Sequence, residues 1–285
     1  MASMENTDPS KTTLVVDDKS VSWYDQEFCD VRGDVREVLV NYAHIAPENI
    51  HEHVMRTRDK AWEVAPYPCI GKFWFLVMNL HRLPCYPLVL SELKNGAKFL
   101  DLGSCMGQDV RRLVYDGAPG ANIVGVDIKG ALLDLGYELW RDRETLAVKF
   151  LEADIFDDSE AAPLRLYREN FDFIHLGMIF HLFTWKMQVK LMERCIMFLK
   201  PQNGSMIMGQ AVGRVEGGDD ALAENVAASF RHSADTFKKL MEEVQEKTGI
   251  KFEVRADIDE DWCLPPGHPS FDPMMRRLVI EVKWV

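Results

Sequence analysis

Residues 99–107 read FLDLGSCMG, and this stretch decides the fold. An apolar run that ends in Asp101 and passes directly into a glycine-bearing turn is typical of a strand leading into a helix. Gly103 lets the backbone approach a ligand at the carboxyl end of the strand, where open α/β sheets bind their ligands. The usual cofactor-binding pattern has an acid followed by three alternating glycines, whereas this chain has Cys105 in place of the middle glycine. The alternative interpretation is a tight strand-to-helix turn that binds no ligand.

Short apolar runs alternate with amphipathic stretches from Gly96 onward. Strands separated by helices indicate right-handed crossovers and a mostly parallel sheet. We predict strands over 98–102, 122–127, 148–152, 171–176 and 204–211, and helices over 109–116, 131–141 and 186–199.

The C-terminal part departs from this alternation. A predicted helix over 221–246 is followed by two strand-like runs, 251–256 and 277–285, which a proline-rich loop joins without a helix. Strands joined without a crossover helix pair antiparallel. The fold class is therefore α/β, with a seven-stranded sheet of five parallel strands and a C-terminal antiparallel hairpin, and with helices on both faces. This arrangement resembles the Rossmann-like fold of class I S-adenosylmethionine (SAM) methyltransferases.

Two further acids end the next two predicted strands. Asp127 stands where a carboxylate grips both ribose hydroxyls in dinucleotide folds. Asp154 precedes the bulky Ile155, a combination that suits an adenine amino group and ring face, although alone such an acid is more often a turn or cap residue. A nicotinamide dinucleotide needs G-x-G-x-x-G, and Gly103 with Gly107 supplies only G-x-x-x-G, so pyrophosphate binding is disfavoured.

The fourth predicted strand ends at Leu176 and Gly177, which we expect to face the methyl donor. His181 follows them and is the candidate catalytic residue. Its alternative role is that of a histidine in a first helical turn, bonded to a backbone carbonyl, whereas His175 is expected to be buried structure. The candidate cofactor-binding residues are Asp101, Gly103, Ser104, Asp127, Ile128, Asp154, Ile155, Leu176 and Gly177.

The N-terminal third has a different composition. Residues 1–20 are polar without a sustained period, which predicts a disordered tail. Residues 21–93 are predicted to form a helical lid, and residues 94–285 the cofactor-binding domain. Aromatic side chains are dense in the lid, where they could exclude water from donor and acceptor or simply anchor the lid to the sheet. The candidate lid residues are Trp62, Tyr67 and Phe73.

The composition of this chain of 285 residues limits the kinds of partner that we expect for it. Its formal net charge of -12 disfavours nucleic acid and anionic lipid. The six cysteines include no C-x-x-C pair and no zinc-type spacing, so we expect reduced thiols in the cytoplasm and no metal site. The longest apolar stretch, 73–78, is far shorter than the ~18 residues that a membrane span requires.

Residues 30–213 resemble the fungal methyltransferases of meroterpenoid (farnesylated polyketide) biosynthesis. The resemblance implies SAM as cofactor and a small-molecule carboxylic acid of a meroterpenoid intermediate as substrate, with a methyl ester as product. The cysteine at position 105, where the general pattern has glycine, does not exclude membership of this family. A homodimer is compatible with the sequence. The segments that carry the resemblance are 58–71, 94–103, 107–119, 134–139 and 153–156.

The acceptor decides what His181 must do. A carboxylic acid with a pKa of ~4 is ionised at neutral pH and needs no strong base, so His181 would orient it. A phenol with a pKa of ~10 would need His181 as a base. An alternative of another class is an assembly module that binds SAM without catalysis.

Overall fold

The computed structural model describes residues 19–28, 31, 33–220, 229–260, 262 and 272–285. Apart from residues 19 and 20, the predicted N-terminal tail lies outside this part of the chain. Of the predicted helix over 221–246, residues 221–228 also lie outside it.

A seven-stranded sheet forms the centre of the molecule, with the strand order β3-β2-β1-β4-β5-β9-β8. The first five strands pair parallel, and β9 pairs antiparallel with β5 and β8. This confirms the predicted fold class, including the C-terminal hairpin. The strands are β1 (Phe99–Leu102), β2 (Ile123–Asp127), β3 (Lys149–Glu152), β4 (Phe173–Gly177), β5 (Met206–Arg214), β8 (Phe252–Asp259) and β9 (Met275–Trp284).

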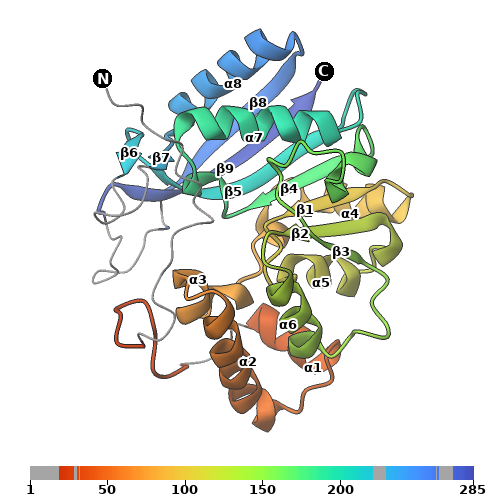
Figure 1. Cartoon of the computed structure of the whole chain (residues 1–285), viewed down its shortest axis with the longest axis vertical. Coiled ribbons are helices and arrows are strands. Elements are labelled where there is room, and N and C mark those ends of the chain that lie inside the picture. Colours follow the sequence, from red (N-terminus) through yellow and green to blue (C-terminus); the bar gives the residue numbers. More distant parts are fainter. Residues whose placement is uncertain (1–18, 29–30, 32, 221–228, 261, 263–271) are drawn as a thin grey trace.

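Helices cover both faces of the sheet because its central strands are apolar on both sides, as parallel strands must be. Leu100, Ile174 and Ile207 pack under α7 (Trp185–Phe198) and α8 (Ala234–Thr248). Phe99 and Phe173 pack under α4 (Tyr86–Lys94) and α5 (Gln108–Tyr115) on the opposite face. Figure 1 shows these layers, with α6 (Gly130–Trp140) beside β2 and β3.

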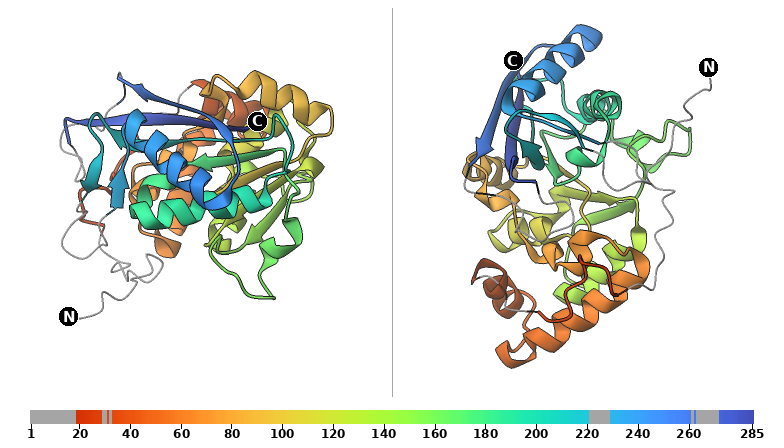
Figure 2. Two further views of the ribbon diagram at one scale, coloured as in Figure 1. Left: turned by 90° about the horizontal axis from the view of Figure 1, so that it is seen from above. Right: turned by 90° about the vertical axis from the view of Figure 1, so that its left-hand side faces the viewer.

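The N-terminal segment forms a helical cap whose apolar core is shared with α6. Its elements are α1 (Gly33–Asn41), η2 (Pro47–Asn49), α2 (Ile50–Val64), α3 (Pro68–Gly71) and η3 (Trp74–Leu76). The apolar face of α2 packs against Leu132, Leu135 and Leu139 of α6, so the cap sits at the end of the molecule away from α8 (Figure 2). Although α4 lies within the range predicted for the lid, it packs on the sheet.

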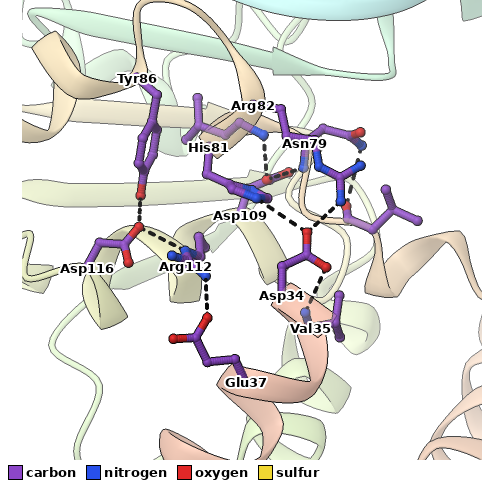
Figure 3. Close-up of polar contacts among 12 residues, drawn as sticks. Asp34, Val35, Glu37, Asn79, His81, Arg82, Tyr86, Asp109, Arg112 and Asp116 are labelled. Carbon is purple, nitrogen blue, oxygen red and sulfur yellow. Dashed lines mark hydrogen bonds and ion pairs between the residues drawn. The ribbon is translucent and has the colours of Figure 1, made fainter. Parts of the chain in front are cut away.

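Polar contacts bind the cap to the sheet domain. Figure 3 shows α1 tied to the segment around η4 (Leu80–Arg82) and to α5: Asp34 accepts from Arg82 at 2.5 Å, and Glu37 pairs with Arg112 at 3.3 Å. In the same region Asp109 of α5 accepts from the backbone N–H groups of Asn79 and Leu80 at 2.7 and 2.8 Å. The chain that leaves the cap is therefore fixed to the helix that follows the cofactor turn.

The prediction of a helix over 221–246 was wrong for residues 229–233. There the chain forms β7 (Ser229–Arg231), which pairs antiparallel with β6 (Gly218–Asp220), where the sequence predicted neither helix nor strand. The helix starts only at Ala234, because Ser233 and Thr236 form a capping box that satisfies the first N–H groups of α8.

Candidate functional site

The glycine turn after β1 brings the backbone close to neighbouring side chains. Gly103 has φ +75°, and a Cβ atom at this position would lie 2.3 Å from Cγ2 of Ile179. Cys105 adopts φ +51°, a left-handed conformation that costs a residue with a side chain about 1–2 kcal/mol. The turn therefore keeps the backbone shape of the glycine pattern at the position where this chain has a cysteine.

Asp127, at the end of β2, is held by the turn itself. Its Oδ2 accepts from the N–H of Cys105 at 2.8 Å, and its Oδ1 accepts from the N–H of Lys129 at 2.9 Å. Burial raises the pKa of Asp127, with the charge of Asp101 adding, whereas the backbone N–H bonds act against the rise. Two backbone bonds orient this carboxylate toward the edge where β1 and β2 end.

Ser104 links the two strands that carry these acids. Its buried hydroxyl donates to the carbonyl of Asp101 at 3.0 Å and accepts from the N–H of Val126 at 3.1 Å. With both hydrogen-bonding roles used inside the protein, the side chain of Ser104 stabilises the turn.

Asp101 makes a contact that the sequence did not predict. Its Oδ1 lies 2.7 Å from Nδ1 of His175, and both side chains are buried. This is the only hydrogen bond of the Asp101 carboxylate within the described residues, which leaves Oδ2 for a ligand. Asp101 and His175 are register partners on β1 and β4, so an alignment of the two predicted strands could have found the pair.

The outer part of the edge is more open. Ile128 is 44% exposed. Asp154 is exposed and accepts from the N–H of Phe156 at 2.8 Å, as expected of an aspartate that only stabilises a turn. Ile155 is half-buried. The roles of Asp154 and Ile155 toward adenine, and that of Ile128 toward the cofactor, stay predictions.

Leu176 and Gly177 end β4 in different surroundings. The side chain of Leu176 is fully buried under α7 and α8, so only its backbone faces the strand edge. At Gly177 an added Cβ would lie 2.8 Å from Cε1 of His175, so this position requires glycine.

His181 lies in η7 (Phe180–Leu182) and contacts the end of β5. Its Nδ1 accepts from the N–H of Val212 at 3.3 Å, which assigns the proton of the neutral ring to Nε2. Burial lowers the pKa of His181 to about 3, with the charge of Arg231 adding. His181 is therefore a neutral hydrogen-bond donor at physiological pH. The sequence missed Arg231 because the β6–β7 hairpin that carries it was not predicted.

The three predicted lid residues have different surroundings. Tyr67 is half-buried, and burial raises its pKa, with the charges of Cys69 and Asp127 adding. Trp62 is 1% exposed and packs edge-on against Tyr24 with ring centroids 4.8 Å apart, inside the core of the cap. Phe73 is also buried in the cap core.

Comparison with known proteins places the chain in a family. A family model described as the N-terminal domain of meroterpenoid methyltransferases matches residues 23–76, and a methyltransferase domain matches residues 99–202. The O-methyltransferase phiE of a fungal species is 41% identical over 85% of this chain and 81% of that protein. The chain belongs to the fungal meroterpenoid methyltransferases.

Other relatives agree with this assignment. The asnovolin E/chermesin D methyltransferase nvfJ of Aspergillus novofumigatus is 35% identical to this methyltransferase over 79% of the chain and 80% of that protein. The fold is similar to that of a Burkholderia thailandensis 1,6-didemethyltoxoflavin N1-methyltransferase bound to S-adenosylhomocysteine (SAH), with a TM-score of 0.51, 16% identity, and coverage of 85% of this chain and 91% of the other.

The residues of the methyltransferase edge fit SAM, the cofactor of this family. In such a site Gly103 would let the ligand approach the backbone, Asp127 would accept from the ribose hydroxyls, and the second carboxylate oxygen of Asp101 would accept from the ammonium group. Among the described residues, no group of three or more acidic, histidine or cysteine side chains could hold a metal ion. In that same part of the chain, no helix is both long and apolar enough to cross a bilayer.

Proposed function

We propose that this methyltransferase transfers the methyl group of SAM to a carboxyl oxygen of a meroterpenoid (farnesylated polyketide) acid and forms a methyl ester. The family membership supports the substrate class. The acid as acceptor is supported by a single observation, the state of His181, whose Nδ1 accepts a backbone N–H and whose pKa is lowered to about 3 by burial.

A histidine in this state suits an acceptor that is already ionised. A carboxylate at neutral pH has no proton to lose, since its ordinary pKa is ~4. The Nε2–H of His181 could donate to one carboxylate oxygen and leave the other as nucleophile. A phenol would need its proton removed, and a neutral imidazole with so low a pKa is a poor base for a group of pKa ~10.

Arg231 of β7 contributes to this state of His181. It is 3% exposed, donates from Nη1 to the sulfur of Met275 at 2.8 Å, and its charge adds to the lowering of the pKa of His181.

The chain's own part in the reaction is placement. SAM, when bound, supplies an electrophilic methyl group on its sulfonium. Asp127 and Asp101 would fix the cofactor, His181 would orient the acceptor oxygen, and Tyr67 of the cap would help to exclude water. Such positioning can contribute about 7–11 kcal/mol to lowering a bimolecular barrier.

The test uses matched acceptors. A farnesylated polyketide acid that also carries a phenol is incubated with the protein and methyl-labelled SAM, beside the same compound with its carboxyl blocked as an ethyl ester. We expect labelling of the free acid alone, and mild alkaline hydrolysis should release the label, because esters hydrolyse where aryl ethers do not. Labelling of the blocked compound, stable to alkali, would replace the acid with a phenol.

A further inference from the structure

The contact between Asp101 and His175 is a buried pair of ionisable groups at the cofactor edge. Each residue stands two positions before a glycine of that edge, Gly103 and Gly177 respectively. Their side chains are 4% and 0% exposed, and Nδ1 and Oδ1 are 2.7 Å apart. From the sequence alone, His175 was expected to be a buried residue with a structural role. In the structure it contacts Asp101, a predicted cofactor-binding residue.

Few charged groups face this pair. Asp109, from α5, acts on the pKa of His175 from the helix side. From β5, the side chains of Met208 and Gln210 point to the same face and carry no charge. On β9 the residue of the same row is Glu281, two strands away from His175. On the other side of Asp101, Asp127 at the end of β2 interacts with the Asp101 charge. His175 itself responds directly to Asp101 and Asp109.

The surroundings of His175 act in opposite directions on its protonation. Burial disfavours the imidazolium, but the hydrogen bond and charge of Asp101, with the charge of Asp109, raise the pKa of His175 above its ordinary value. At the same time Nε2 is buried without a hydrogen-bond partner among the described residues. A proton on Nε2 would thus be a buried unpaired N–H, which is tolerated only while the neighbouring carboxylates are anionic.

We propose that His175 is a positioning residue for the methyl donor: it holds the Asp101 carboxylate through Nδ1–H and gives up its second proton when Asp101 receives the ammonium group of the donor. The ammonium replaces the imidazolium as the counter-charge of Asp101, and the proton on Nε2 passes to the solvent buffer. Cofactor binding is then linked to pH whichever acceptor is methylated.

The sign of this linkage follows from the competition between two cations. Below the pKa of His175 the imidazolium already neutralises Asp101, so the donor must displace a proton and binds more weakly. Affinity should fall by up to tenfold per unit of decreasing pH in that range. Above it, His175 is neutral and affinity becomes independent of this residue.

Calorimetry with SAH tests the proposal without turnover. Titrations in buffers of different ionisation enthalpy give the protons released per ligand bound. His175→Asn keeps an N–H donor near the position of Nδ1 but cannot titrate, so we expect affinity within about threefold of wild type at pH 8 and a loss of the proton release seen in wild type at lower pH. His175→Leu lacks the donor, and its affinity should fall at least tenfold at every pH. Subtracting the proton release of His175→Asn from that of wild type cancels the protons that come from the ligand's own amino group.

Two controls separate His175 from other titrating groups. Asp109→Asn should lower the pH at which protons are released but retain the release, because the charge of Asp109 raises the pKa of His175 while the contact with Asp101 remains. His53→Asn alters a buried histidine whose Nε2 contacts the carbonyl of Leu139 in α6, and it should behave as wild type. Equal proton release by wild type and His175→Asn would overturn the proposal.

A second measurement covers the case in which a His175 variant does not fold. Ring ¹⁵N shifts of wild-type histidines, recorded with and without SAH, report which nitrogen is protonated. One buried histidine should change from imidazolium to the Nδ1–H form on binding. If no buried histidine changes between pH 6 and 8, the proposal is wrong.

Discussion

The backbone N–H of Val212 donates to Nδ1 of His181 across 3.3 Å, and this contact decides which ring nitrogen carries the proton. Val212 lies near the end of β5 and His181 follows β4, so two neighbouring strands of the sheet fix the ring between them. A neutral imidazole held in this way can donate from Nε2 but accepts a proton only in strong acid.

The first prediction concerns the pH profile of methyl transfer. Because burial lowers the pKa of His181 to about 3, this residue stays neutral from pH 6 to 9 and should contribute no inflection there. With saturating SAM, the rate on the proposed acid should be nearly flat over this range. His181→Asn should lower the rate by about tenfold through poorer orientation. A loss of three or more orders of magnitude that is restored at higher pH would show instead that His181 is a base.

A second prediction concerns Asp127 and the affinity for SAH. Asp127→Ala removes a carboxylate that two backbone N–H groups orient, and should weaken binding by about 1.5–3 kcal/mol, the range for losing a partner of charged hydrogen bonds. Asp154→Ala is the matched change at the more exposed strand end and should cost less. Calorimetry that finds equal affinities for Asp127→Ala and wild type would exclude Asp127 from the cofactor site.

Substitutions at Gly103 and Gly96 separate two costs of adding a side chain: backbone strain at positive φ, and a clash with a neighbouring side chain. Both have positive φ, +75° and +100°, but a Cβ at Gly103 would meet Ile179 at 2.3 Å, whereas at Gly96 nothing lies within 4 Å. Gly96→Ala should cost about 1–3 kcal/mol in the free energy of unfolding. Gly103→Ala should cost at least about 1 kcal/mol more, since it also overpacks the turn. Denaturant unfolding measures both, and equal costs would mean that Ile179 moves aside freely.

A further prediction distinguishes cap residues that stabilise the fold by packing from those that act at the cofactor and acceptor. Trp62→Ala should destabilise the protein by about 3–5 kcal/mol because the ring is fully buried in the cap. Tyr67→Ala, at a half-buried ring facing Asp127, should leave unfolding less affected but weaken SAH binding and turnover. If Trp62→Ala lowers turnover at unchanged stability, Trp62 acts at the acceptor and not through packing.

The sequence predicted the central sheet well because its signals are local. Apolar runs that end in Asp101 and Asp127, separated by amphipathic helices, indicate strands and crossovers without knowledge of what they contact. The antiparallel hairpin of β8 and β9 followed from the lack of a helix between two strand-like runs. These predictions needed only the spacing of apolar residues along the chain and the length of the segments that connect the strands.

The parts that failed depend on pairing between distant residues. The Asp101–His175 contact requires the register of β1 against β4, and the partner of His181 requires the end of β5. The β6–β7 hairpin was missed because a Gly-Gly-Asp-Asp stretch favours a loop unless another strand pairs with it. The start of α8 did have a local signal, the Ser233 and Thr236 capping box.

The last prediction concerns a buried ion pair of the sheet domain to which the cap is hydrogen-bonded. Arg111 of α5 binds both oxygens of Asp142, at 2.9 and 3.0 Å, with the two side chains 0% and 3% exposed. Tyr42, which follows α1 in the cap, donates to the same carboxylate at 2.7 Å.

Asp142→Asn leaves the Arg111 charge buried without its counter-charge, which should cost about 3–5 kcal/mol in the free energy of unfolding and make the cap more sensitive to proteolysis. The matched surface pair is Arg143 with Asp134, also 2.9 Å apart but 54% and 67% exposed. Asp134→Asn should cost less than ~1 kcal/mol, because solvent screens an exposed pair. Tyr42→Phe should fall between the two, since it removes one hydrogen bond but no charge. Equal costs for Asp142→Asn and Asp134→Asn would mean that the buried pair relaxes into solvent and does not contribute to holding the cap.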